Sequence, residues 1–229
     1  MQIIILAGGK GTRLKSETGD TPKVMADINN RPFLDYILDD ILKYDIDKVI
    51  LAVGYNKEYI KNYYNDSYKG LKLEYSEENS PLGTGGAIKK ALTLCDDDSC
   101  FIVNGDIYHT INYNDMFDQY KKANVDVYLA LKNMKNIERF GTVEVKNNKI
   151  IKFNEKKKVD EGLINVGCYI FKKDILNDYP DIFSIEEDFF NKNINNLKNS
   201  YYLYDGYFTD IGIPEDYHKF IDIQNKKEL

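Results

Sequence analysis

A glycine-rich loop with basic residues follows the first apolar run of the chain, residues 2–7. The loop consists of Gly8, Gly9, Lys10, Gly11, Thr12 and Arg13, and Pro22 and Lys23 come shortly after it. Glycines let backbone N–H groups approach a phosphate closely, while arginine offers a planar fork to phosphate oxygens and lysine offers a mobile point charge. The pattern predicts a phosphate-binding loop, and a plain strand-to-helix turn with solvated Lys and Arg is the alternative.

The spacing of this loop excludes two common nucleotide-binding patterns. A Walker A loop needs Gly-x4-Gly-Lys-Ser/Thr, but Ile4 stands at its first glycine and Gly11 follows the lysine. The dinucleotide pattern Gly-x-Gly-x-x-Gly fails because Leu14 follows Arg13. Arg13 and Lys23, rather than Lys10, are therefore the expected phosphate-binding cations.

Two aspartates stand at the ends of apolar runs. Asp106 follows the run FIVNG, and Asp210 lies in GYFTDIGIPEDY just before Gly212. Open α/β sheets place their ligands at the carboxyl ends of strands, and Mg²⁺ on a nucleoside triphosphate is usually held by one or two carboxylates. Each aspartate alone could equally be a turn acid, and the run Asp96–Asp98 is expected to be a solvated turn.

A second glycine-rich stretch, EENSPLGTGGA, covers residues 77–87. Gly83, Gly85 and Gly86 would allow the backbone to approach a flat ligand closely before the chain turns helical. The alternative is a flexible connection between a strand and a helix.

The elements that would position these residues alternate between strands and helices. Apolar runs predict strands at 2–7, 48–53, 101–104 and 125–131, and periodic patterns predict helices at 32–43, 56–64 and 84–94. This order predicts an α/β fold, with a mixed, mostly parallel central sheet and helices on both faces.

The second half of the chain has a different pattern. We expect a hairpin turning at Asn147-Asn148, a strand at 162–171 and a helix over 184–197 capped by Ser184 with Glu187. A strand at 201–212 and a helix at 214–227 would follow. One domain, 1–229, is predicted, with a nucleotide-binding half at 1–124 and a second half at 125–229 that completes the pocket.

Composition restricts the function classes. A net charge of -6 over 229 residues argues against a general nucleic-acid binder. No apolar stretch has the ~18 residues of a membrane span, and no leader peptide is recognisable. Three sparse cysteines indicate a reducing compartment, so a cytoplasmic protein without a zinc site is expected. The oligomeric state stays open, with a homodimer as one alternative.

Several of these stretches occur in a familiar order. The run LAGGKGTRL followed by Pro-Lys resembles the signature of sugar-1-phosphate nucleotidyltransferases, and PLGTGGAIKKAL, VNGDIY, FGTVEV, GLINVGCYIF and GYFTDIGIPEDY extend the resemblance. The resemblance implies a Rossmann-like α/β enzyme that joins a sugar 1-phosphate to a nucleoside triphosphate and releases pyrophosphate. Within the family the chain is most similar to the branch that uses GTP and D-glycero-α-D-manno-heptose 1-phosphate, which makes a GDP-sugar for surface polysaccharides.

Other readings of the function remain. The sugar could be mannose 1-phosphate, and the nucleotide could be UTP or CTP. A non-catalytic nucleotide-sensing domain would be marked by loss of Arg13, Lys23 or an aspartate, and all are present. A glycosyltransferase generally carries an Asp-x-Asp motif, whereas Ile107 and Tyr108 follow Asp106 here.

The resemblance also implies roles for individual residues. It makes Arg13, Lys23 and Asp106 catalytic and assigns Mg²⁺, the implied cofactor, to Asp106 and Asp210. It assigns nucleotide binding to Leu6, Ala7, Gly8, Gly9, Gly11, Thr12, Glu78, Pro81, Gly83, Thr84, Asn104 and Gly105. It assigns sugar-phosphate binding to Gly141, Glu155, Lys156 and Asn165, although Lys157 stands where a proline is frequent in relatives.

The expected base follows from the residue type at position 78. The resemblance implies that Glu78 reads the base edge. A carboxylate only accepts hydrogen bonds, and guanine presents two adjacent donors, whereas uracil and thymine suit a glutamine better. Glu78 therefore favours GTP, with Glu77 or backbone groups as the alternative reader.

Overall fold

The first strand, β1 (Gln2–Leu6), lies at the centre of the main sheet because it is apolar on both faces. In the computed structural model, which describes residues 1–226, Ile3 and Ile5 belong to one buried core and Ile4 to the other. β1 pairs in parallel with β4 (Lys48–Val53) and β7 (Ser99–Asn104), and β4 pairs in parallel with β6 (Leu71–Glu77). Such continuous apolar runs are typical of parallel strands covered by helices on both faces.

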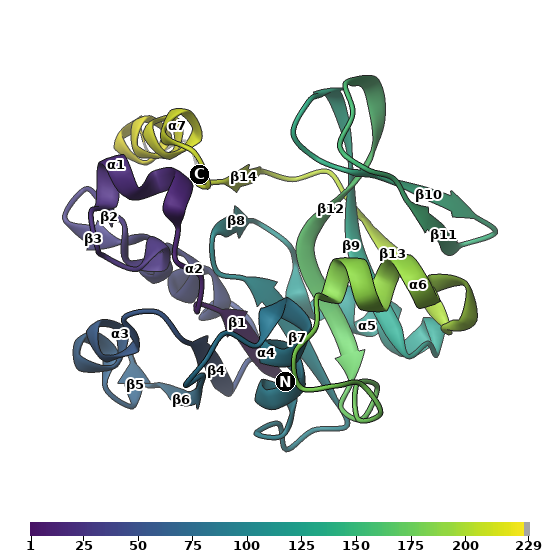
Figure 1. Ribbon diagram of the computed structural model, residues 1–229, viewed down its shortest axis with the longest axis horizontal. Helices are drawn as coiled ribbons and strands as arrows, with labels where there is room; N and C mark the ends of the chain where they lie inside the picture. The colour runs from purple at the N-terminus through teal and green to yellow at the C-terminus, as the bar shows by residue number, and fades with distance from the viewer. Residues whose placement is uncertain (227–229) are drawn as a thin grey trace.

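The second half of the chain extends the same sheet beyond β7. β12 (Val159–Lys172) runs antiparallel to β7, and the strands follow the order β11-β10-β12-β7-β1-β4-β6-β5 (Figure 1). β9 (Val127–Ile137) joins the other edge of β12, and β13 (Asn199–Tyr204) joins β9 in parallel. The remaining strands of this sheet are β5 (Ser67–Tyr68), β10 (Thr142–Lys146) and β11 (Lys149–Phe153). The predicted mixed α/β sheet is confirmed.

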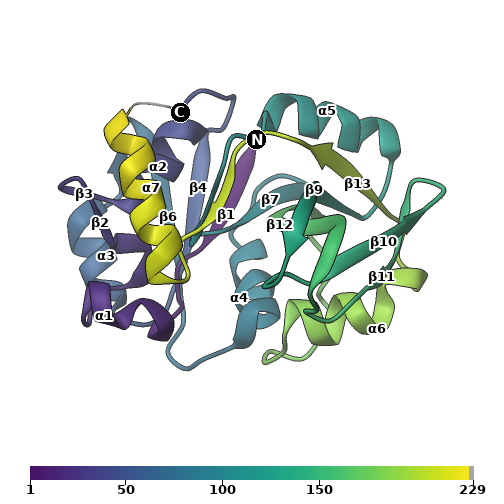
Figure 2. The same ribbon diagram turned by 90° about the horizontal axis from the view of Figure 1, so that it is seen from above.

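Helices cover both faces of the sheet, as Figure 2 shows from above. One core is formed with α2 (Phe33–Ile41), α3 (Lys57–Tyr64), α5 (Tyr113–Ala123) and α7 (Pro214–Lys226). The other is formed with α4 (Gly83–Leu92) and the π-helical turn Ile185–Phe190. The short elements are α1 (Lys15–Thr18), α6 (Asn191–Asn193), β2 (Asp27–Ile28), β3 (Arg31–Pro32), β8 (Ile107–His109), β14 (Phe208–Asp210) and the 3₁₀ turns Thr12–Leu14, Lys23–Met25 and Ile194–Asn196.

The strand expected at 201–212 is wrong as a single element. β13 ends at Tyr204 and β14 begins at Phe208, and the two strands belong to different sheets. β14 pairs with β8, so that Asp210 stands opposite Ile107. The break therefore carries the end of the chain back to the strand that follows Asp106.

The helix expected at 184–197 is interrupted. Ser184 caps it as predicted, because its hydroxyl accepts a hydrogen bond from the Glu187 N–H. The Ser184 N–H donates to the carboxylate of Asp188 and not to that of Glu187, since the first turn is a wider π turn. The hairpin at Asn147-Asn148 is confirmed, with φ of 51° and 57°.

Three further expectations concern the closing helix, a membrane span and the cysteines. The closing helix expected at 214–227 is α7, and residue 227 lies outside the described residues. No helix in the part of the chain that the structure describes is long and apolar enough to cross a membrane. The three cysteines are buried free thiols.

Strand β8 ends in a buried histidine. His109 is 4% exposed, its ring contacts Tyr113 and Tyr204, and neither ring nitrogen has a hydrogen-bond partner among the described residues. Burial lowers the pKa of His109 to about 4. In the unfolded chain this group titrates near pH ~6.5.

His109 should therefore reduce stability in mild acid. The unfolded state takes up a proton below about pH 6.5 while the folded state resists it until pH falls to its lower pKa, so the free energy of unfolding falls across this window by about 3 kcal/mol. His109→Phe keeps the aromatic contacts and removes the titration. Urea unfolding at several pH values should give curves that diverge from wild type below pH ~6.5; a constant difference between the two proteins at all pH values would contradict this account.

Candidate active site

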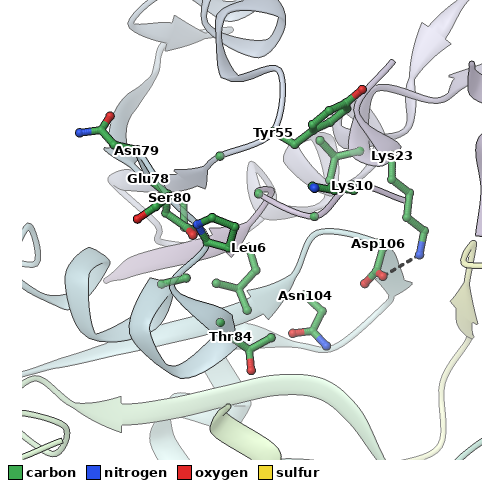
Figure 3. A pocket seen from close by; sticks show the side chains of 18 residues that line it. Leu6, Lys10, Lys23, Tyr55, Glu78, Asn79, Ser80, Thr84, Asn104 and Asp106 are labelled. Carbon is green, nitrogen blue, oxygen red and sulfur yellow. Dashed lines mark hydrogen bonds and ion pairs between the residues drawn. The ribbon is translucent and has the colours of Figure 1, made fainter. Parts of the chain in front are cut away.

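The carboxyl ends of β1, β4 and β7 border a cavity of about 770 Å³. A volume of this size is typical of a pocket for a small organic molecule such as a nucleotide. Figure 3 shows Glu78 and Lys23 on well-separated parts of its wall, with Asp106 next to Lys23. The lining residues are Leu6, Gly8, Gly9, Lys10, Lys23, Val24, Ala52, Gly54, Tyr55, Glu78, Asn79, Ser80, Pro81, Gly83, Thr84, Ala87, Asn104 and Asp106.

Many predicted nucleotide-binding residues lie in this lining, but five predicted residues of the first half lie outside it, as does Asp210 of the second half. The Ala7 N–H donates to the Ala52 carbonyl, and the Gly105 N–H donates to the Leu6 carbonyl at 3.0 Å. A Cβ at Gly105 would lie 2.5 Å from that carbonyl oxygen. The other three, Gly11, Thr12 and Arg13, also lie outside the lining.

Gly11 is required by the position of Lys23. Its φ of 59° lies in the left-handed region, and a Cβ there would lie 2.8 Å from the Cβ of Lys23. Arg13 follows on the turn Thr12–Leu14 and is exposed. Within residues 1–226 no hydrogen bond or ion pair holds its guanidinium, so the side chain can reach toward a ligand above the loop.

Lys23 and the two aspartates form one cluster. The Lys23 ammonium lies 2.6 Å from Asp106 Oδ2 and 3.5 Å from Asp210 Oδ1. The Asp106 carbonyl accepts a hydrogen bond from the Ile211 N–H at 3.1 Å, which ties the two aspartates together through the backbone. The pair predicted from sequence therefore converges on a single positive charge.

The donor set at this cluster fits Mg²⁺. Two carboxylates are the usual protein contribution to a Mg²⁺ bound with nucleotide phosphates and water. Asp106 and Asp210 already direct oxygens at one cation, the ammonium of Lys23. Residues 1–226 contain no cluster of three or more Asp, Glu, His or Cys side chains that could hold a metal ion. Other ligands would thus come from a substrate and from water.

Glu78 lies in the lining and is oriented by the protein. Its backbone N–H donates to the Val53 carbonyl, and its Oε2 accepts from the Leu82 N–H at 3.0 Å. Its Oε1 lies 3.0 Å from where a Cβ on Gly8 would stand. A glycine at position 8 therefore lets this carboxylate rest against the opening loop.

Two glycines in the stretch after Glu78, Gly85 and Gly86, are explained by protein packing and not by a ligand. A Cβ on Gly85 would lie 2.3 Å from the Phe183 ring, and one on Gly86 would lie 2.1 Å from the Asp181 carbonyl oxygen. The Phe183 carbonyl accepts hydrogen bonds from the N–H groups of both glycines. Packing of the segment around Phe183 against α4 accounts for these two glycines, and of the three only Gly83 lines the cavity.

Thr84 connects the cavity to the second half of the chain. Its hydroxyl donates to Glu186 Oε2 at 2.9 Å and accepts from the Ile185 N–H at 3.0 Å. Sequence reasoning named Thr84 but not these partners. The π turn that starts at Ile185 is therefore fastened to the wall of the cavity.

The predicted sugar-phosphate residues lie outside the cavity lining. A Cβ on Gly141 would lie 2.5 Å from the Asn154 carbonyl oxygen, so Gly141 lies beside the loop that carries Glu155 and Lys156, both exposed. Asn165 holds a bulge in β12, where its side chain accepts from the Gly167 N–H and donates to the Tyr169 hydroxyl.

Several lining residues were missed by sequence reasoning. They are Lys10, Val24, Ala52, Gly54, Tyr55, Asn79, Ser80 and Ala87. The signal for Ala52, Gly54 and Tyr55 was present, because the run at 48–53 ends beside the opening loop in any parallel pairing of the first two strands. The Tyr55 N–H donates to the Gly8 carbonyl and makes this contact explicit.

The glycine-rich loop after β1, together with Asp106 after β7 and Asp210 at the end of β14, can be compared with known classes of enzyme. A model of the nucleotidyl transferase family matches residues 2–227, and the chain belongs to this family. It is an enzyme family, and the match covers nearly the whole sequence.

The similarity extends to named relatives. The chain is 45% identical to D-glycero-alpha-D-manno-heptose 1-phosphate guanylyltransferase of Campylobacter jejuni, covering 96% of this chain and 99% of the relative. It is 44% identical to the protein of the same name from Aneurinibacillus thermoaerophilus, covering 96% of each. The crystal structure of HddC from Yersinia pseudotuberculosis complexed with GMP-PN superposes with a TM-score of 0.86 at 34% identity, over 96% of this chain and 98% of that one.

Gly86→Ala should destabilise the protein through the contact with Asp181. The added methyl would meet a backbone oxygen at 2.1 Å, and the cost of this overpacking, ~1–3 kcal/mol, outweighs the gain of about 1 kcal/mol from a better helix former. Thermal unfolding should give a lower midpoint than wild type. Gly9→Ala is the matched control, because a Cβ there meets nothing within 4 Å, and equal midpoints for both variants would contradict the packing role.

Proposed function

We propose that this protein is a sugar-1-phosphate guanylyltransferase that joins D-glycero-α-D-manno-heptose 1-phosphate to GTP, giving a GDP-heptose and pyrophosphate. The observation that carries the proposal is the arrangement of one cavity, with an oriented acceptor, Glu78, in one part of its wall and the Lys23–Asp106–Asp210 cluster by another (Figure 3). The two heptose 1-phosphate guanylyltransferases that match over full length support the substrate choice.

The guanine is bound by Glu78 in this proposal. Leu82 donates its N–H to Oε2, so the remaining lone pairs of the carboxylate can accept from N1–H and N2–H of guanine. The opening loop then faces the phosphates, since Gly8, Gly9 and Lys10 lie in the same lining. Arg13 reaches the transferring phosphate from its exposed turn.

Asp106 and Asp210 would hold Mg²⁺ in the loaded enzyme. When bound, the ion would neutralise charge on the triphosphate, which is the main requirement of nucleotidyl transfer. Lys23, next to both aspartates, adds a positive charge where two anionic substrates meet. This cluster reduces the repulsion that would otherwise keep the substrates apart.

The reaction is a direct displacement. A phosphate oxygen of the sugar 1-phosphate forms a bond to the α-phosphorus of GTP, and the bond from that phosphorus to the bridging oxygen of pyrophosphate breaks. The attacking phosphate is already anionic near neutral pH, so no strong general base is needed. The protein acts by positioning and by stabilising charge that develops on the transferring group.

The second half of the chain binds the sugar phosphate. Glu155 accepts hydrogen bonds from neighbouring sugar hydroxyls, Lys156 pairs with the phosphate, and the Gly141 backbone contacts the ring. Both charged side chains are exposed on the loop before β12 and are available for this role. Asn165 would add one N–H donor and one acceptor lone pair, because only one N–H and one lone pair of its amide are used within the β12 bulge.

The cellular role follows from the product. We propose a cytoplasmic enzyme that supplies a GDP-sugar for surface polysaccharides, with no nucleic-acid or membrane partner. A homodimer is compatible with this role.

Pyrophosphate release tests the proposal directly. Purified protein with Mg²⁺ should release pyrophosphate when GTP and the heptose 1-phosphate are both present, and not when either is omitted. A panel with mannose 1-phosphate, UTP and CTP tests substrate choice. If kcat/KM is higher with one of these than with the corresponding proposed substrate, that compound replaces the proposed substrate in the assignment.

Loss of a charge-stabilising group should reduce turnover strongly. Asp106→Asn and Arg13→Ala are each expected to lower kcat by about 10²- to 10³-fold, the scale for removing one partner of developing charge. Asp97→Asn is the matched control, because Asp97 is an exposed residue of the acidic turn. Near-normal turnover in both site variants would exclude the assigned roles.

Glu78→Gln should reverse the hydrogen-bond polarity offered to the base. The Leu82 N–H requires an acceptor, so the amide oxygen of the new side chain would face Leu82 and its N–H₂ would face the cavity. The preference for GTP over UTP, measured as a ratio of kcat/KM values, should fall by about tenfold or more. Glu77→Gln is the control, since Glu77 pairs with Lys57 and Lys61 outside the lining; a loss of preference in this variant instead would make Glu77 the base reader.

A further inference from the structure

Lys23 lies where a cation between the two aspartates would be expected. Its side chain is 9% exposed, against 38% for Asp106 and 21% for Asp210, so Lys23 is the least accessible of the three side chains. The dashed contact in Figure 3 joins it to Asp106. Asp210 Oδ1, which faces the ammonium, also accepts from the Gly212 N–H at 2.6 Å. A single positive charge thus occupies the space that both carboxylates address.

Two glycines fit closely around this lysine. A Cβ on Gly11 would lie 2.8 Å from the Lys23 Cβ, and a Cβ on Gly212 would lie 3.0 Å from the Lys23 ammonium. One glycine comes from the opening loop and the other from the segment after β14. Both ends of the Lys23 side chain are therefore closely packed, while the residue as a whole lines the cavity.

The charges of the cluster do not allow a metal ion and this ammonium to share one place. With Lys23, the two carboxylates carry a net charge of about -1, from two single negative charges and one positive charge. A divalent cation in the same position would meet the ammonium at close range, where like charges disfavour each other strongly. Another anion would favour displacement of the ammonium, and the phosphates of a nucleotide in the adjoining cavity are suited to receive it.

We infer that Lys23 is an exchangeable internal counter-ion that excludes divalent cations from the Asp106–Asp210 pair until a nucleotide is bound. Nucleotide phosphates draw the ammonium away and the cation takes its place, so that metal binding and nucleotide binding are coupled through one side chain. The inference rests on the proposed assignment of Asp106 and Asp210 as metal ligands. It adds that Lys23 suppresses metal binding in the nucleotide-free protein.

Binding of Mn²⁺ to nucleotide-free protein tests the inference without any measurement of activity. The Lys23→Met variant lacks the internal positive charge and should bind Mn²⁺ about tenfold more tightly than wild type. Binding is measured by water-proton relaxation. Lys10→Met is the matched control, because Lys10 lines the same cavity and pairs with neither aspartate, and its affinity should stay close to wild type. Equal affinities in wild type and Lys23→Met would overturn the inference.

A second substitution separates this inference from the proposed function. Asp106→Asn in the Lys23→Met background should abolish the gain in affinity. If Asp106→Asn leaves Mn²⁺ binding unchanged even with a non-hydrolysable GTP analogue present, the aspartates are not the metal ligands and the proposed site itself fails. If Asp106→Asn weakens that binding while Lys23→Met has no effect, only the counter-ion exchange is wrong.

A measurement on wild-type protein covers the case in which Lys23→Met does not fold. The ¹⁵N resonance of the Lys23 ammonium should stay in place on addition of Mg²⁺ alone and shift when Mg²⁺ and the GTP analogue are added together. An unchanged resonance at saturating Mg²⁺ and analogue would overturn the exchange.

Discussion

The site depends on holding two carboxylates together against their mutual repulsion. A three-residue antiparallel pairing does this, because β14 aligns Asp210 opposite Ile107 of β8, directly after Asp106. The backbone bond from Ile211 to the Asp106 carbonyl fixes the same register. Two negative charges at this distance need a compensating cation, and the Lys23 ammonium provides it in the described structure. A short ladder and one lysine thus join segments that are more than a hundred residues apart in sequence.

Close backbone packing is the second constraint. Gly105 allows the end of β7 to lie against the end of β1, and Gly11 allows the opening loop to lie against Lys23. Gly85 and Gly86 allow α4 to receive the segment around Phe183. The glycines that mark this sequence are therefore of two kinds. Gly8, Gly9, Gly54 and Gly83 lie in the lining of the cavity, whereas Gly11, Gly85, Gly86 and Gly105 hold protein segments in contact with one another.

The sequence predicts the parts of this structure that depend on local patterns. Apolar runs identified β1, β4 and β7, and the position of Asp106 after such a run predicted its place at the carboxyl edge. Contacts between distant segments could not be read in this way. No residue near Gly85 in the sequence indicates that Phe183 packs against it. The break between Tyr204 and Phe208 follows from the pairing of β13 with β9 and of β14 with β8, which the sequence pattern does not show. Strand β6 and helix α5 were missed because their patterns are more polar than the central runs.

The N-terminus of α4 shows how the second half of the chain affects a cavity that the first half lines. All lining residues fall within residues 6–106, so among the described residues the second half contributes none of the cavity wall. The Phe183 carbonyl, however, accepts from the N–H groups of Gly85 and Gly86, which a helix N-terminus could otherwise offer to a phosphate. That end of α4 is thus partly satisfied by protein, and the basic side chains that line the cavity, Lys10 and Lys23, come from the opening loop and from the turn that follows it. The second half thus acts on the cavity indirectly. Its Phe183 carbonyl occupies N–H groups at the N-terminus of α4, and its Asp210 lies beside Lys23.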